Sequence, residues 1–179
     1  MRIIKDGQVV EDNWLHLADS HEIAAGPITV SINRWRNHRA EFRARSDRTG
    51  LRLSGADSLQ DIVGSLSDLP IIVLEFTAMA DGRIFSHARL LRERYGFKGE
   101  LRARGDFIPD QVFFLSRVGV NAFEFGEENA LAEGLRKLSE FSVKYQAAAD
   151  EKHPLYRRRL PSRLVPAPTA AAADRGNGN

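Results

Sequence analysis

The sequence contains no cysteine, and this absence removes several kinds of chemistry at once. Without thiols the chain cannot form disulfides, offer a thiol nucleophile, ligate an iron–sulfur cluster or build a thiolate zinc site. Sequence motifs of common enzyme classes are missing as well: there is no phosphate-binding loop, no G-x-G-x-x-G, no G-x-S-x-G and no H-E-x-x-H. Five histidines are scattered without metal-ligand spacing, so we expect neither a bound metal nor a cofactor.

Long hydrophobic runs are also absent. No apolar run approaches the roughly 20 residues that a membrane-spanning helix needs, and the opening stretch MRIIKDGQVVEDNW has neither an apolar h-region nor a small-residue cleavage site. With 42% hydrophobic and 28% charged residues, the composition is that of a soluble globular protein. We therefore expect a cytoplasmic protein that does not bind membranes.

Positive charge is concentrated near the end of the chain. The formal net charge is +2, but residues 157–179 contain five arginines and one aspartate, so residues 1–156 carry −2. A mildly acidic body disfavours specific nucleic-acid binding. The last segment is rich in Pro, Ala and Gly without apolar periodicity, which predicts one α/β domain over residues 1–156 and a disordered basic tail over 157–179.

Five strand-like segments alternate with helix-like segments along the body of the chain. The strand candidates are ITVSI from residue 28, GLRLSG from 50, IIVLEF from 71, ELRARG from 100 and AFEFG from 122. This alternation predicts an α/β fold with a parallel sheet of about five βα units. An incomplete (β/α) barrel and a flavodoxin-like doubly wound sheet both need about this many strands, so both stay open. Asp6-Gly7 between two β-prone pairs predicts an N-terminal β-hairpin.

One strand candidate is polar on one face. Glu100, Arg102 and Arg104 alternate with apolar residues, whereas strands covered on both faces are almost continuously apolar. Charged residues also recur near the ends of the neighbouring strands, at Glu75 and Glu124. We therefore expect an open, barrel-like sheet, or a sheet whose second face meets a partner.

The segment Asp81-Gly82-Arg83 lies between the strand candidate 71–76 and an amphipathic helix, where α/β proteins often bind ligands. Asp81 can simply turn the chain, with Gly82 supplying a permissive dihedral angle and Arg83 in solvent. Alternatively, the helix N-terminus and Arg83, with Ser86 nearby, hold a small oxyanion. This second interpretation predicts that Arg83→Ala loses function while the protein stays folded.

Two more acids follow the next strand candidate. Asp106 and Asp110 flank the start of a helix at Pro109, where acids commonly cap a helix or compensate its dipole. General acid–base chemistry is the alternative. Loops after consecutive parallel strands lie at one edge of the sheet, so these groups can converge with Asp81 and Arg83. The candidate ligand-binding residues are Asp81, Gly82, Arg83, Ser86, Arg102, Arg104, Asp106 and Asp110.

The predicted helices differ in how much polar surface they have. Residues 112–118, VFFLSRV, leave little polar face, so this helix must be buried or covered by a partner, and Phe113 and Phe114 are the candidate interface residues. That partner could be a second copy of the chain. A helix from Arg83 to Gly96 and a long last helix, whose apolar stripe extends to Tyr145, show ordinary amphipathic periodicity.

A combination of residues throughout the body resembles DUF934, a bacterial family of unknown function. The combination comprises Asp81-Gly82-Arg83, ARLLR at 88–92, GELRA at 99–103, Gly105-Asp106, Asp110-Gln111, and outlying positions such as Trp14, Trp35 and Tyr145-Gln146. It covers nearly the whole chain before the predicted tail. Members of that family are typically encoded beside the haemoprotein subunit of sulfite or nitrite reductase, and some are described as oxidoreductases without demonstrated chemistry.

The resemblance implies an accessory protein of assimilatory sulfite reduction that acts with the haemoprotein subunit of sulfite or nitrite reductase. The alternative is an enzyme or sensor, such as an oxidoreductase, that binds a small oxyanion at the Asp81-Gly82-Arg83 edge. Where relatives have Arg-Cys-Gly-Phe, this chain has Arg117-Val118-Gly119-Val120, so a thiol cannot be essential here. The sequence leaves open whether the protein is an enzyme at all.

Overall fold

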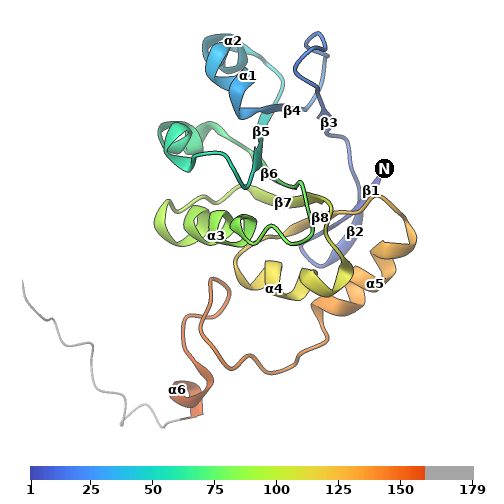
Figure 1. Ribbon diagram of the computed structural model, residues 1–179, viewed down its shortest axis with the longest axis vertical. Coiled ribbons are helices and arrows are strands. Elements are labelled where there is room, and N and C mark those ends of the chain that lie inside the picture. Colours follow the sequence, from blue (N-terminus) through green and yellow to red (C-terminus); the bar gives the residue numbers. More distant parts are fainter. Residues whose placement is uncertain (160–179) are drawn as a thin grey trace, which may run out of the picture.

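One eight-stranded mixed sheet organises the fold (Figure 1). The computed structural model describes residues 1–159. The strands are β1 (Arg2–Lys5), β2 (Gln8–Glu11), β3 (Leu15–His16), β4 (Ile28–Ser31), β5 (Thr49–Ser54), β6 (Ile71–Phe76), β7 (Glu100–Gly105) and β8 (Ala122–Glu124). Their order in the sheet is β2-β1-β8-β7-β6-β5-β4-β3. The predicted hairpin is confirmed as β1 and β2, joined at Asp6 and Gly7, which both have positive φ.

The five predicted βα strands lie side by side in chain order. Strands β4 to β8 are parallel neighbours, and β3 extends this parallel part, while β1 runs antiparallel to both β2 and β8. A flavodoxin-like sheet would reverse its strand order at a switch point. The flavodoxin-like prediction is therefore wrong, and the mixed sheet is larger than the five parallel strands that the sequence predicted.

The sheet curls into a half-barrel. Nε2 of His16, on edge strand β3, lies 2.8 Å from Oε2 of Glu124 on β8, although four strands separate β3 from β8 in the sheet. In Figure 1 the segment between β2 and β3 runs along the open side of the curl. This segment and β3 therefore bring the two sides of the half-barrel together.

Helices cover the convex side of the curl (Figure 1). They are α1 (Ile32–Asn37), α2 (Arg39–Ala44), α3 (Arg83–Arg89) with a π-helical turn η3 (Leu90–Arg94), α4 (Val112–Arg117) and α5 (Asn129–Leu138), with 3₁₀ turns η1 (Leu59–Asp61), η2 (Val63–Asp68) and η4 (Pro109–Gln111). The short helix α6 (Leu155–Arg159) lies apart from the sheet, after the segment that follows α5. Within residues 1–159, no helix has both the length and the apolar character needed to cross a membrane.

The hydrophobic core lies between the convex face of the sheet and these helices. It contains Leu53, Leu74 and Leu101 from the strands, together with Ile84 and Leu115 from the helices, all fully buried. Burial of such side chains contributes roughly 1.5–3 kcal/mol each. Along each strand, every second side chain therefore points into this core, and the side chains between them point to the concave face.

Of two predicted apolar helix stripes, the structure confirms one and contradicts the other at one residue. The predicted stripe of α3 is confirmed, since Ile84, Ala88 and Leu91 are buried and Gly96 takes a positive φ where the helix ends. The stripe of the last helix is wrong at Tyr145, which is 69% exposed, because α5 already ends at Leu138. Beyond that point, the Ser139 hydroxyl donates to the carbonyl of Arg136 and helps to terminate the helix.

The predicted start of the tail falls inside a helix. Helix α6 spans Leu155–Arg159 and so crosses the boundary drawn after residue 156. The rest of the predicted tail, residues 160–179, lies outside the described residues.

Candidate functional site

The concave face of the half-barrel is lined by charged side chains that the strand register aligns. In the parallel ladder, Arg104 of β7 lies opposite Glu75 of β6 on one side and Glu124 of β8 on the other. Paired residues on parallel strands point to the same face. The polar alternation of residues 100–104 is therefore continued by acids on both neighbouring strands, which confirms the predicted barrel-like sheet with a polar face.

Arg102 lies at the centre of this face and is only 1% exposed. Its Nη1 and Nη2 donate to the two carboxylate oxygens of Asp12 at 2.8 and 2.9 Å, and its Nε donates to Glu100 at 2.8 Å. Nη1 also donates to Oε2 of Glu124 at 3.1 Å. Burial by itself lowers the pKa of Arg102, but the hydrogen bonds and charges of Asp12 and Glu100 outweigh burial and raise that pKa. Arg102 is therefore a permanent cation held by three buried carboxylates.

Glu124 connects this cluster to the mouth of the half-barrel. Its Oε1 accepts a hydrogen bond from Nε of Arg104 at 2.8 Å, and Nη1 of Arg104 donates to Glu75 at 2.8 Å. His16 contacts Oε2 of Glu124 through Nε2, and its Nδ1 lies 2.6 Å from the hydroxyl of Thr29. Burial raises the pKa of Glu124, but His16, Arg104 and Arg102 together lower it to about 2. Glu124 is therefore ionised, and it connects Arg104 on β7 to His16 on the edge strand β3.

The depressed pKa of Glu124 predicts a pH dependence of stability. A carboxyl group whose pKa falls from 4.5 to about 2 on folding stabilises the native state above pH 4.5 by on the order of 3 kcal/mol. This contribution is lost as the pH falls from 4.5 toward 2. In urea unfolding at a series of pH values, the difference between the native protein and Glu124→Gln should therefore shrink across that window. The exposed Glu127, changed to Gln, is the control, and a constant difference for Glu124→Gln would contradict this role.

Three residues of the cluster have the geometry of a metal site. One ligand atom each from Asp12, His16 and Glu124 lie within 4.8 Å of one another. However, Arg102 donates to Oδ2 of Asp12 and to Oε2 of Glu124. A cation bound there would face a buried guanidinium and would compete with it for the same oxygens. The cluster is therefore better described as an ion-pair network that holds the half-barrel closed.

The Asp81-Gly82-Arg83 segment forms its own ion pair at the carboxyl edge of the sheet. Nε and Nη2 of Arg83 donate to the two oxygens of Asp81 at 2.8 and 2.9 Å, and the backbone N–H of Arg83 also reaches Asp81. The hydrogen bond from Arg83 is the main cause that lowers the pKa of Asp81. A Cβ added to Gly55 would lie 2.4 Å from the Asp81 carboxylate, so that carboxylate packs on the loop after β5.

The other predicted ligand residues occupy separate places. Asp106 accepts a hydrogen bond from the backbone N–H of Met79 at 3.1 Å, so the loops after β6 and β7 do approach each other as expected. Asp110 pairs with Lys137 of α5 at 2.6 Å. In the described part of the chain, Ser86 is exposed and forms no side-chain hydrogen bond. Arg102 and Arg104 belong to the concave network, away from the Asp81–Arg83 pair.

An aromatic surface, formed by Phe113, Phe114 and Phe141, lies on α4 and the segment after α5. The ring of Phe113 is 7% exposed and lies 4.7 Å from the Phe141 ring and 5.5 Å from the Phe114 ring. Phe114 and Phe141 are 57% and 50% exposed. Of the two predicted interface residues, only Phe114 is exposed to solvent. Phe113 is buried and packs against the rings of Phe114 and Phe141.

Sequence reasoning missed the two residues that close the half-barrel. Asp12 and His16 contact β7 and β8 across 90 and 108 positions of the chain. No spacing in the sequence connects Asp12 to Arg102. The alternation of charges at residues 100–104 was the available signal, since three like-facing polar residues on a buried strand require buried counter-charges.

The fold and these contacts define an α/β half-barrel with a charged, internally paired concave face. A family model for a bacterial protein of unknown function, DUF934, matches residues 50–156, which include strands β6 to β8, all of β5 but its first residue, and the aromatic surface. The chain belongs to this family. A comparison with curated proteins finds no match to this chain.

Proposed function

We propose that the protein is an accessory protein of assimilatory sulfite reduction that binds the haemoprotein subunit of sulfite or nitrite reductase. The structural observation that carries this proposal is the aromatic surface, where Phe114 and Phe141 are half exposed around a buried Phe113. Clustered exposed aromatic side chains are typical of protein interfaces. The choice of partner rests on the resemblance, because members of the family are typically encoded beside that subunit.

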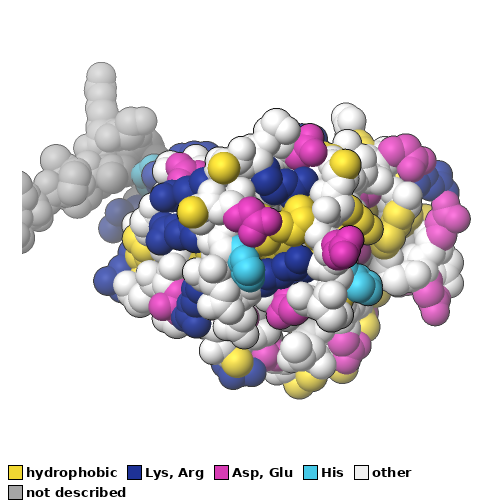
Figure 2. All heavy atoms as spheres, turned by 90° about the horizontal axis from the view of Figure 1, so that it is seen from above, with side chains coloured by type: hydrophobic (Ala, Val, Ile, Leu, Met, Phe, Trp, Pro, Cys, Tyr) yellow, Lys and Arg dark blue, Asp and Glu magenta, His cyan; other side chains and the backbone are white. Residues whose placement is uncertain are grey.

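The pairing of the charged residues favours binding over catalysis. On the concave face, the side chains of Arg102, Arg104, Glu124 and Asp12 are hydrogen-bonded to one another. A catalytic acid or base needs a free, accessible group near its substrate. On the side of the molecule that Figure 2 shows, Lys and Arg side chains are also interspersed with Asp and Glu side chains.

The alternative function, oxyanion binding at the carboxyl edge, makes Arg83 essential. Because Asp81 already accepts hydrogen bonds from two nitrogens of the Arg83 guanidinium, an anion there would meet an adjacent carboxylate. We expect Arg83→Ala to leave the melting temperature and growth on sulfate as sole sulfur source close to native, since Arg83 is 61% exposed. Growth that fails as in a deletion strain, with the variant folded and abundant, would instead support the oxyanion site. Arg43→Ala, at another exposed ion pair, is the matched control.

Co-purification tests the proposed partner in cells. An affinity-tagged chain, expressed at its native level in bacteria growing on sulfate, should retain the reductase haemoprotein through washing at moderate salt. The Soret absorption of the bound haem group and mass spectrometry of the retained proteins would measure the ratio of the two subunits. A ratio near one to one supports the proposal, and retention no higher than from an untagged strain would refute it.

A further inference from the structure

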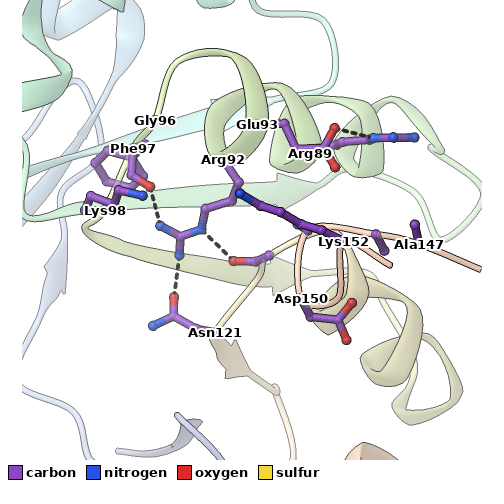
Figure 3. Close-up of a pocket in the computed structure, with 13 residues that line it drawn as sticks. Arg89, Arg92, Glu93, Gly96, Phe97, Lys98, Asn121, Ala147, Asp150 and Lys152 are labelled. Atoms are coloured by element: carbon purple, nitrogen blue, oxygen red, sulfur yellow. Dashed lines mark hydrogen bonds and ion pairs between the residues drawn. The ribbon is translucent and has the colours of Figure 1, made fainter. Parts of the chain in front are cut away.

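A second candidate site lies at the opposite end of the strands from the Asp81–Arg83 pair. A cavity of about 840 Å³ opens between the helix formed by α3 and η3, the loop before β7 and the segment 147–152 (Figure 3). Its charged lining residues are Arg89, Arg92, Glu93, Lys98, Asp150 and Lys152. The cavity is large enough for a small organic molecule.

The two acids of the lining are already neutralised by cations. Glu93 accepts a hydrogen bond from Nε of Arg89 at 2.8 Å. Asp150 pairs with Arg117 at 3.1 Å and also with Lys144. In Figure 3 the carboxylate of Asp150 points away from Arg92. Neither acid therefore compensates the remaining positive charges of the cavity.

Arg92 is a half-buried cation whose hydrogen-bond partners are all neutral. Its Nε donates to the carbonyl of Gly119, and Nη1 donates to the carbonyls of Phe97 and Gly99 at 2.7 and 2.9 Å. Nη2 donates to Oδ1 of Asn121 at 3.0 Å. These four bonds use four of the five N–H groups of the guanidinium. Burial lowers the pKa of Arg92, and the negative charge of Asp6 offsets only part of this effect.

Two lysines add to this positive charge. Lys98 and Lys152 line the cavity, and neither forms an ion pair with any residue in the range 1–159. In Figure 3 the side chain of Lys152 points toward Arg92. The wall that carries Lys152 is held in place, because the backbone N–H of Ala149 donates to the carbonyl of Arg117 at 3.0 Å. Arg92, Lys98 and Lys152 form no direct ion pair with an acid of residues 1–159, although the charge of Asp6 acts on Arg92. These three cations line one cavity in a body whose net charge is −2 over residues 1–156.

We propose that this cavity binds a small organic anion through a phosphate or sulfate group, with Lys98 and Lys152 as direct ligands and Arg92 as the source of fixed positive potential. Charge-assisted hydrogen bonds from ammonium groups suit a tetrahedral oxyanion. The lining also includes apolar surface from Phe97 and from alanines 147–149, which an inorganic ion would leave uncovered. The organic ester should therefore bind more tightly than the inorganic ion. This inference does not depend on the reductase partner.

Isothermal titration calorimetry at constant ionic strength tests the site, with inorganic phosphate, sulfate and adenosine 5′-monophosphate as probes and chloride as the reference anion. We expect saturable binding of the oxyanions, tightest for the organic monophosphate, and at least about tenfold weaker binding by the double variant Lys98→Gln/Lys152→Gln. Both lysines are exposed, so this variant should fold normally.

The control variant is Arg94→Gln. Arg94 is an exposed cation on η3, the helical turn that also carries Arg92, but it does not line the cavity. It should bind the probes as the native protein does. Equal affinity of the double lysine variant and the native protein would overturn the proposal. So would the absence of saturable binding for all three oxyanions. Inorganic phosphate binding as tightly as the monoester would also overturn it, by showing that the apolar wall contributes nothing.

Discussion

Replacing Arg102 by methionine should lower the free energy of unfolding by about 3–5 kcal/mol, the typical cost of removing one partner from a buried ion pair. The substitution leaves Asp12, Glu100 and Glu124 in a buried cluster without their shared cation. A loss of this size is a large part of the 5–15 kcal/mol typical of a domain. Urea unfolding at neutral pH measures it directly.

Two further variants make the Arg102 prediction specific. Arg43→Met removes the arginine of an ion pair whose two side chains are each 44% exposed, so the change in stability should be far smaller. Adding Asp12→Asn to Arg102→Met should recover part of the lost stability, because it removes one of the uncompensated carboxylates. If Arg102→Met costs no more than Arg43→Met, the buried network does not hold the half-barrel together.

The second large effect is expected at the aromatic surface. Phe114→Asp should weaken association with the reductase haemoprotein at least about tenfold, as expected when a charge replaces an aromatic hot-spot residue. The melting temperature should change little, because Phe114 is 57% exposed. Surface plasmon resonance with immobilised haemoprotein and thermal unfolding measure the two quantities.

Leu90→Asp is the matched control for the aromatic surface. Leu90 is a 38% exposed apolar residue on the helix of α3 and η3, outside the aromatic surface. This variant carries the same charge change and should bind the haemoprotein as the native chain does. Equal losses in both variants would point to a general effect of charge, and full affinity in Phe114→Asp would remove the aromatic surface from the interface.

Much of the fold could be predicted from local sequence patterns. Short β-branched runs such as residues 71–76 predict the strands. Asp6-Gly7 predicts the N-terminal hairpin because both residues tolerate positive φ. The choice between half-barrel and doubly wound sheet was harder, since strand order depends on which units pack together. The alternation of Glu100, Arg102 and Arg104 with apolar residues favoured the incomplete barrel. A doubly wound sheet, covered by helices on both faces, would bury those charges without partners.

The candidate site was less predictable because its contacts join distant segments. Asp12 and His16 look like ordinary loop and edge residues in the sequence, and only the curl of the sheet brings them to Arg102 and Glu124. The sequence left open whether Arg83 lies in solvent or binds an anion, and it did not indicate the ion pair that Arg83 forms with Asp81 in the structure. The cations of the cavity come from segments around residues 92, 98 and 152, which no local pattern connects.

The most direct test of the proposed function is sedimentation velocity with the purified chain and the purified haemoprotein subunit of sulfite or nitrite reductase from the same bacterium, detected at the haem absorption band. The account predicts a faster-sedimenting species of fixed stoichiometry with the native chain, and its loss with Phe114→Asp. A haemoprotein boundary that stays unchanged at micromolar concentrations of the native chain would contradict the account.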